Sequence, residues 1–471
     1  MKTQFLLAVT SFLVTTIIHA QFQAGAATED ITPKEWPVNL VGSFGPRLAE
    51  SAHDPLMARA IVLSDGKMKI AICVVDNCLI ERQFHDQAKA IVAEKTGIPP
   101  ENQLISATHT HSAPPGLVGS NHVPGDAAYQ KQLPVGIAAA IIKAHEKLQP
   151  AGVGFGRGNL EDEVFNRRWF LKEGAMPVNP FGDPNDKVKM NPGRGPNLVT
   201  PAGPTDPEIA VLSIVDAKNN PLGLLANYSL HYVGRTPSGQ VSADYFGEFG
   251  RLMPIRLRSV SPDFVAMMSN GTSGDINNIR FTDPRPGREV FEQIRIVAGK
   301  AADVATRAHT DIETFSKDAM LGMRERIVAL KRRQPTAEQI ERAQEIVKID
   351  SDEEKKKLPR LAVNYAERIL KMVDYPETYD VKIQTVRIGK DIAICSTPFE
   401  TLVEIGLELK EKSPFKNTFT IELANGWYGY LPTPKQHELG GYETWLSTSQ
   451  VQKDASEILT KHLLEMLKEL E

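Results

Sequence analysis

The chain has 471 residues, of which 41% are hydrophobic and 24% charged, a balance typical of a globular protein with a large core. Its formal net charge of −4 indicates no basic surface for nucleic acid, so nucleic acid is not an expected partner. Three cysteines are too few for a disulfide framework, and their positions argue against a cysteine-based metal cluster.

The first 20 residues have the pattern of a secretory signal peptide. Lys2 supplies a positive start, an apolar run follows from Phe5 to Ile18, and Ala20 is a small residue at the expected cleavage point. The run is short for a membrane span, and a retained membrane anchor is the alternative interpretation. We expect an exported protein, secreted or periplasmic, whose mature chain begins near Gln21 and keeps no transmembrane anchor.

The N-terminal half alternates strand and helix signals. Residues 60–75 predict a hairpin with its turn at Asp65-Gly66, and the second strand of this hairpin is buried. A helix is expected over about 83–96, a short strand over 104–107 and another helix over about 132–148. The short strand delivers two histidines to the loop at its end.

The middle of the chain begins with residues 174–206, which are rich in proline, glycine and asparagine and predict a long surface loop. A second hairpin is expected over 210–228 and a helix over about 287–308. Residues 334–372 are strongly charged and predict a helical arm inserted at about 330–373. A final amphipathic helix is expected over about 449–470. Because helices alternate with strands throughout, we expect a single large α/β domain over 21–471, with sheets flanked by helices.

The sharpest chemical signal is Ser-Ala-Thr-His-Thr-His-Ser at 106–112. His109 and His111, two residues apart in a strand extension, point the same way and could supply a metal ligand and a neighbouring proton carrier. The alternative is a pair of polar loop histidines with no catalytic role. His231, at the end of an apolar strand, is equally open to interpretation as a hydrogen-bonded histidine of the sheet edge.

Three further segments have structural explanations when each is taken alone. The small-residue loop 269–278 is rich in turn-forming side chains. Glu400 lies at a helix start, where the helix dipole favours a carboxylate. Tyr428, Tyr430 and Tyr442 lie in a stretch rich in glycine and proline, where packing is a sufficient explanation.

Taken together, these segments resemble the catalytic domain of the neutral/alkaline (non-lysosomal) ceramidases. The stretches that carry the resemblance run from about residue 25 to 450. They are the histidine motif 106–112, a second histidine at His231, Pro398-Phe399-Glu400 for the family's Pro-Gly-Glu, Tyr430 with Tyr442-Glu443 for its Tyr-Val-Thr-Thr…Tyr-Glu, Gly274-Asp275-Ile276 for its Gly-Asp-Val, and Asn166-Arg167 for an Asn-Arg pair near the substrate.

The resemblance implies a zinc-dependent hydrolase, most simply an amidohydrolase that cleaves the N-acyl amide of a ceramide-like lipid through water activated by Zn²⁺. It implies a general acid/base at His111. It also implies that Arg167, Tyr442 and Asp275 bind and orient the substrate. The implied zinc ligands are His109, His231, Glu400 and Tyr430.

The sequence departs from the family pattern at three places. Asn277 stands where the family has the serine of Gly-Asp-Val-Ser-Pro-Asn. An amide cannot act as a nucleophile but can donate to an oxyanion, so Asn277 is the second predicted catalytic residue. Phe399 replaces the glycine of Pro-Gly-Glu. No run of short strands follows residue 450, so we expect no C-terminal immunoglobulin-like domain.

Two alternatives stand beside the lipid amidase. The first is a zinc hydrolase acting on a glycan or on a non-lipid amide or ester, which Asn277 and the polar segment 174–206 favour slightly. The second is a non-catalytic binding protein with the same fold, because fold alone does not fix function. The expected partner in the hydrolase interpretations is a small-molecule or lipid substrate.

Overall fold

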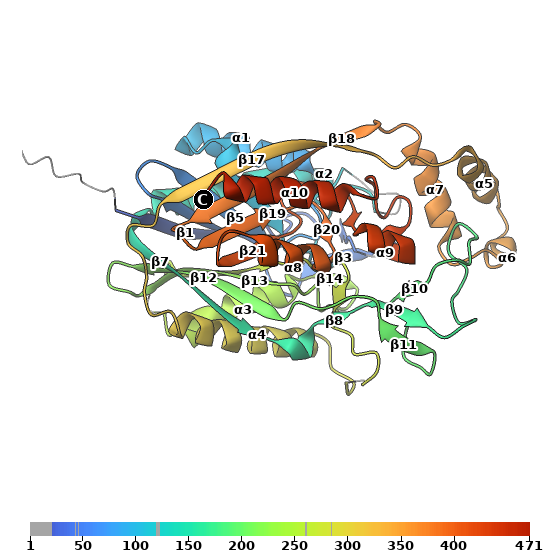
Figure 1. Ribbon diagram of the computed structural model, residues 1–471, viewed down its shortest axis with the longest axis horizontal. Helices are drawn as coiled ribbons and strands as arrows, with labels where there is room; N and C mark the ends of the chain where they lie inside the picture. Colours follow the sequence, from blue (N-terminus) through green and yellow to red (C-terminus); the bar gives the residue numbers. More distant parts are fainter. Residues whose placement is uncertain (1–20, 43, 46, 119–122, 260, 284) are drawn as a thin grey trace, which may run out of the picture.

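The computed structural model describes residues 21–471 except positions 43, 46, 119–122, 260 and 284. The expected signal peptide, residues 1–20, lies outside the described residues. The fold is a mixed α/β domain in which sheets share a central core and helices cover their outer faces (Figure 1). In the described part of the chain, no helix is long and apolar enough to cross a membrane.

The largest sheet has eight strands in the order β15-β13-β12-β7-β1-β4-β5-β6. The two predicted hairpins are confirmed, because β4 pairs antiparallel with β5 and β12 with β13. Only two residue pairs join β1 to β7, so the sheet is weakly joined at this point. The strands are β1 (Gln23–Asp30), β4 (Met57–Ser64), β5 (Lys69–Val75), β6 (Gln103–Ala107), β7 (Gln149–Asn159), β12 (Glu208–Asp216), β13 (Pro221–Tyr228) and β15 (Val265–Asn270).

A second sheet has the order β17-β18-β19-β21. It packs against both halves of the eight-stranded sheet, and Ile72, Leu212 and Ile394 belong to the same buried core. Within these two sheets, three pairs of neighbouring strands run parallel: β5 with β6, β13 with β15, and β19 with β21. The four strands are β17 (Leu321–Lys331), β18 (Thr378–Ile388), β19 (Ile392–Ser396) and β21 (Asn417–Ile421).

Helices close the outer face of each sheet region. Helix α2 packs on β1 and β4 with α1 beside it, α3 and α4 pack on β7, β12 and β15, and α8 and α10 pack on the second sheet. Their bounds are α1 (Arg82–Thr96), α2 (Ala127–Glu146), α3 (Asp244–Arg256), α4 (Glu292–Thr310), α8 (Val403–Lys412) and α10 (Ala455–Lys468). Gly97 ends α1 in a left-handed conformation with φ 72°, as predicted.

Three helix boundaries differ from the sequence prediction. Helix α2 begins at Ala127 because the Asp126 side chain accepts from the Tyr129 amide and caps the helix earlier than expected. Helix α4 begins at Glu292, after Phe291 adopts a left-handed φ of 62° that a helix cannot continue through. Helix α10 begins at Ala455, because Ser449 and Val451 instead form bridges to other segments.

The prediction that 174–206 is a loop throughout was wrong. It contains β10 (Val188–Met190) and β11 (Leu198–Pro201), which flank β9 (Arg168–Leu171) in a small sheet. Their pairing depends on a strand outside the segment, which composition alone does not reveal. The other short elements are β2 (Val38–Asn39), β3 (Leu48–Ala52), β8 (Phe165–Asn166), β14 (Gly239–Val241), β16 (Ile276–Asn277), β20 (Glu400–Thr401), β22 (Tyr430–Leu431), and the 3₁₀ turns η1 (Pro100–Asn102), η2 (Glu161–Glu163) and η3 (Tyr442–Thr444).

Three helices connect β17 to β18, within the charged segment that predicted a helical arm. They are α5 (Ala337–Val347), α6 (Asp352–Lys355) and α7 (Ala362–Met372). Helices α5 and α7 bury a small apolar core of their own that includes Ile346 and Ile369. In Figure 1 the arm lies at the end of the molecule that also carries α9 (Pro434–Leu439), far from the C-terminus of α10.

Candidate active site

Three side chains from distant parts of the sequence meet at one buried point. His109 follows β6, His231 follows β13, and Glu400 opens β20. The Nε2 atoms of His109 and His231 lie 2.9 Å apart. The Glu400 carboxylate oxygen Oε2 lies 3.3 Å from the first of these atoms and 3.7 Å from the second. This cluster has the composition and spacing to hold a metal ion.

The hydrogen bonds behind the two imidazoles indicate that a cation fits between them. Nδ1 of His109 lies 2.9 Å from the Cys78 carbonyl oxygen, and Nδ1 of His231 lies 3.0 Å from the Ser273 carbonyl oxygen. A carbonyl can only accept, so both rings carry their proton on Nδ1. Their Nε2 lone pairs therefore face each other at 2.9 Å, an arrangement that a cation relieves.

The Glu400 carboxylate can bind the same cation. Oε2 of Glu400 is buried and has no hydrogen-bond partner among the described residues, while Oε1 accepts from Trp427 Nε1 at 3.2 Å. Burial alone would raise the pKa of Glu400, yet the Tyr430 hydroxyl and the Arg167 guanidinium help to hold that pKa below its ordinary value. The group is therefore an ionised carboxylate with one free oxygen aimed at the histidines.

Backbone geometry holds the cluster in place. His109 has a left-handed φ of 73°, which is rare for a residue with a side chain and turns its ring into the cluster. A Cβ at Gly274 would lie 2.6 Å from the Glu400 carbonyl oxygen, so glycine permits this close approach. Strand β20 pairs in parallel with β22, which sets Glu400 opposite Tyr430.

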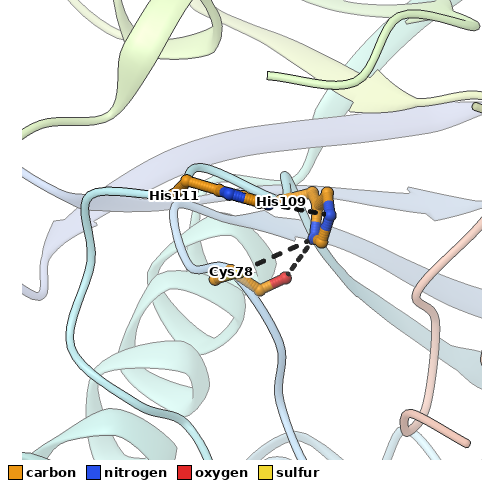
Figure 2. Close-up of side chains that lie close together, drawn as sticks. All are labelled: Cys78, His109 and His111. Carbon is orange, nitrogen blue, oxygen red and sulfur yellow. Dashed lines mark hydrogen bonds between the residues drawn. The ribbon is translucent and has the colours of Figure 1, made fainter. Parts of the chain in front are cut away.

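His111 lies beside the cluster rather than within it. Its Nε2 is 3.2 Å from His109 Nε2, and Figure 2 shows the two imidazoles together above Cys78. The ring stacks on Tyr232 with 3.6 Å between centroids. Burial and the nearby positive charge of Arg47 lower the pKa of His111 well below its ordinary value. A neutral imidazole at this position can accept a proton.

Arg167 connects the cluster to Tyr430. Its Nη2 donates to the Tyr430 hydroxyl at 3.0 Å and to the Gly274 carbonyl at 2.7 Å, and its Nη1 lies 3.4 Å from His231 Nε2. Its Nε donates to Glu443 at 2.9 Å, which anchors the guanidinium from behind. The predicted ligand Tyr430 therefore lies against the cluster with its hydroxyl oriented by a fixed arginine.

Tyr442 and Asp275 occupy different positions. The Tyr442 ring lies edge-on to Tyr430 with 5.5 Å between centroids and lines the pocket described below. Asp275 is fully buried, accepts from the Val403 amide at the start of α8 and from Asn166 Nδ2, and does not line that pocket. Burial raises the pKa of Asp275 to about 6. Asp275 also supports Arg167, whose backbone amide donates to its carbonyl.

The Asn277 side chain makes hydrogen bonds with other residues of its own surroundings. Its Nδ2 donates to Asn191 at 2.5 Å, its Oδ1 accepts from the Ile279 amide, and it is not among the residues that line the pocket. The amide thus already has partners. Its catalytic role stays a prediction that comes from the resemblance.

A pocket of about 530 Å³ opens onto the cluster. One wall is apolar and includes Val41, Leu79 and Leu117, which belong to the core beneath α1 and α2. The pocket continues toward α7 and the start of β18. At the cluster it is lined by His109, His111, Glu400, Trp427, Tyr430 and Tyr442.

Several supporting residues were not singled out from the sequence. Ser273 lies against His231 Nδ1, and its hydroxyl donates to the buried Glu422 at 2.6 Å. Burial raises the pKa of Glu422 to about 8. Glu443 bonds both Arg167 and Arg168. Glu443 directly follows Tyr442 in the motif and Ser273 lies in the loop 269–278, whereas Glu422 carried no sequence signal.

Comparison with known proteins points to one family. Residues 22–283, more than half of the chain, match the model described as "Neutral/alkaline non-lysosomal ceramidase, N-terminal". Neutral ceramidase B of Dictyostelium discoideum is 26% identical over 276 residues, which is 55% of this chain and 36% of that protein. Neutral ceramidase A of the same organism is 24% identical over 321 residues, or 64% of this chain and 42% of that protein.

The fold agrees with these matches. The crystal structure of neutral ceramidase from Pseudomonas aeruginosa superposes with a TM-score of 0.71 at 18% identity, covering 96% of this chain and 74% of that chain. The aligned part of the chain spans less than half the length of these two Dictyostelium relatives. It belongs to the neutral/alkaline non-lysosomal ceramidase family.

Proposed function

We propose that the protein is a zinc-dependent amidohydrolase that cleaves the N-acyl amide of a ceramide-like lipid. The observation that carries the proposal is the buried cluster of two facing imidazole lone pairs and one free carboxylate oxygen. His109, His231 and Glu400 would hold the ion, with Tyr430 as the fourth ligand. The chemistry that zinc supplies when bound is Lewis acidity, which polarises a carbonyl and acidifies water.

The remaining residues carry out the proton transfers and the positioning. His111, neutral and adjacent to the cluster, accepts a proton from the attacking water and returns it to the leaving amine. Arg167 orients Tyr430, while Tyr442 bounds the pocket beside it. The apolar wall at Val41 and Leu117 is suited to an acyl chain.

Export is the second part of the proposal. It rests on the signal-peptide pattern of residues 1–20, which lie outside the described residues. Cleavage near Ala20 would leave the mature domain in the periplasm or outside the cell. N-terminal sequencing of protein recovered from the periplasm and the medium of an expressing culture tests this, and a chain that still begins at Met1 would contradict it.

The direct test of the activity is fatty-acid release from ceramide by the purified mature protein, with added zinc and with chelator. We expect release with zinc and none after chelation. If the protein holds zinc but releases no fatty acid, lipid amidase activity is refuted. The same assay repeated with glycan, ester and non-lipid amide substrates then tests the second candidate, which Asn277 in place of the family serine favours.

A further inference from the structure

The pocket that opens onto the histidine cluster ends at a second group of charged side chains. Arg332 directly follows β17, and Arg368 and Lys371 lie on α7. All three line the same pocket as His109 and Glu400. None of them belongs to a motif of the family resemblance, and their charge is opposite to that of the carboxylate at the cluster.

The Arg332 guanidinium lacks hydrogen-bond acceptors. The residue is 5% exposed, and its Nε, Nη1 and Nη2 atoms are buried without a partner among the described residues. The guanidinium lies 3.9 Å from the centroid of the Tyr375 ring and 5.3 Å from that of Tyr379. Cation–π contact offsets part of the cost of burying the charge, but it leaves every N–H without an acceptor.

Carboxylates do not neutralise this end of the pocket. In the part of the chain that the structure describes, no ion pair involves Arg332, Arg368 or Lys371. Apart from Glu400 at the cluster, Glu81 is the acidic residue of the lining; its oxygens accept from Gln83 and from the Val118 amide, and one carboxylate cannot balance three cations. The far end therefore carries excess positive charge.

Ring contacts link the far end to the cluster. Tyr442 contacts Tyr430 at 5.5 Å and Phe44 at 5.8 Å between centroids, and the Arg368 guanidinium lies 6.0 Å from the Phe44 centroid. Arg368 thus lies beyond Phe44 from the cluster. A molecule with its scissile bond at the cluster can extend along these rings toward the arginines.

The Arg332 guanidinium is covered by the side chain of Tyr375, which can move. Tyr375 is 47% exposed and lies in the turn between α7 and β18, so one face of its ring is in solvent. Rotation of an exposed side chain takes picoseconds to nanoseconds. A shift of this ring opens Arg332 to a ligand without moving the strands.

We propose that this end of the pocket binds an anionic oxygen group on the amine side of the substrate, with Arg332 as the residue that determines the preference. The proposal rests on the amidohydrolase function proposed above. The guanidinium fork matches a carboxylate or phosphate in two-point contact, and Arg368 and Lys371 add positive charge. The acyl chain would lie along the apolar part of the lining that includes Val41 and Leu117.

Matched substrates test the preference directly. N-lauroylglycine, N-lauroyl-β-alanine and N-lauroyl-4-aminobutyrate place a carboxylate at three distances from the amide, and each is compared with its uncharged carboxamide. An N-lauroylphosphoethanolamine arm, compared with N-lauroylethanolamine, distinguishes phosphate from carboxylate. Laurate release gives kcat/KM for each compound with the zinc-loaded, full-length mature protein.

We expect the wild type to prefer the anionic member of at least one pair. R332M should lower the anionic-to-neutral ratio of kcat/KM by about 10- to 100-fold, the size of one or two charge-assisted hydrogen bonds. R324M is the matched control, because Arg324 is exposed on β17 and absent from the pocket lining. It should leave the ratio unchanged.

The outcomes separate the two proposals. A wild type that releases laurate without preferring an anion in any pair overturns the anionic subsite and leaves the hydrolase standing. A wild type that releases laurate from no substrate overturns the amidase. Calorimetric titration with the same pairs then tests the anionic subsite by itself. Weaker binding of the anion by R332M than by R324M supports the subsite, and equal binding refutes it.

Discussion

The two ends of the pocket differ in how their polar atoms are satisfied. At the cluster, the Nδ1 atoms of His109 and His231 and the guanidinium of Arg167 have fixed partners, so only the atoms that face a metal ion are free. At the far end, all three nitrogens of Arg332 lack partners. The side chains at the cluster are therefore preorganised for chemistry, whereas the Arg332 guanidinium can gain its hydrogen bonds from a bound ligand.

Their place in the sequence differs in the same way. His109 and His231 lie within residues 22–283, the part that matches the family model, while Arg332 lies outside it on the connection to the helical arm. Glu400 and Tyr430 also lie outside that range, so the cluster is assembled from both parts of the chain, whereas Arg332 comes from the connection to the arm alone. Changes at the cluster should abolish turnover, and changes at the far end should shift preference.

The largest effect is expected for Glu400→Ala. Removing the free carboxylate should release the ion and lower kcat/KM by about 10³-fold or more, because a bound metal contributes several kcal/mol to the transition state. Metal content by mass spectrometry and fatty-acid release are measured together, and chelation of the wild type should reproduce the loss. Glu408→Ala, at a half-exposed glutamate of α8, is the control. Full metal content in Glu400→Ala would remove this residue from the ligand set.

His111→Ala should lower turnover by about 10²- to 10⁴-fold, the usual contribution of general acid–base catalysis. The metal content should stay at the wild-type value, because His111 lies beside the cluster and its ring is held by Tyr232. Loss of metal together with activity would make His111 a ligand and would contradict the proposed division of roles.

Glu443→Ala should cost about 3–5 kcal/mol in the free energy of unfolding, because it leaves the buried guanidiniums of Arg167 and Arg168 without their shared carboxylate. Urea denaturation measures this. The same experiment on R332M should show a much smaller change, since Arg332 has no carboxylate to lose. Equal losses of unfolding free energy in the two variants would contradict the difference between the paired guanidiniums of Arg167 and Arg168 and the unpaired guanidinium of Arg332.

Lys89 is a buried cation that does not line the pocket, and Lys89→Met compares it with Arg332. Burial lowers the pKa of Lys89 to about 7, and its Nζ lies 3.8 Å from a carboxylate oxygen of Glu325. Between pH 7 and pH 10 the unfolded chain keeps a proton that the folded chain has released, so wild-type stability rises with pH in this window. Urea midpoints should rise less steeply with pH in the variant. An unchanged slope would show that Lys89 titrates normally.

The smallest effect is expected for Asn277→Ala. Because its amide is bonded to Asn191 and does not line the pocket, we expect kcat/KM for laurate release to change by less than about threefold. A fall of 10²-fold or more would instead support the oxyanion role that the resemblance implies for Asn277.

Local patterns in the sequence were sufficient to predict much of the fold. The Asp65-Gly66 turn and the apolar alternation around it predicted the β4–β5 hairpin, and Gly97 predicted the end of α1. The strands β10 and β11 were missed because their stability comes from pairing with β9 rather than from their own composition.

The candidate site was predictable only where residue type and spacing carried the signal. His109 and His111 stand two residues apart, and the spacing from Tyr430 to Tyr442 matched the family motif. Arg332 was not predictable. Its guanidinium packs against Tyr375 and Tyr379, and the three helices of the arm separate these tyrosines from Arg332 in the sequence.

Anomalous diffraction at the zinc absorption edge, from crystals of the mature protein grown with zinc, tests the central claim most directly. We predict one strong peak within coordination distance of Nε2 of His109, Nε2 of His231 and Oε2 of Glu400, since these atoms converge on one point. A zinc-replete crystal with no peak there, or with its peak at another place in the molecule, would contradict the account.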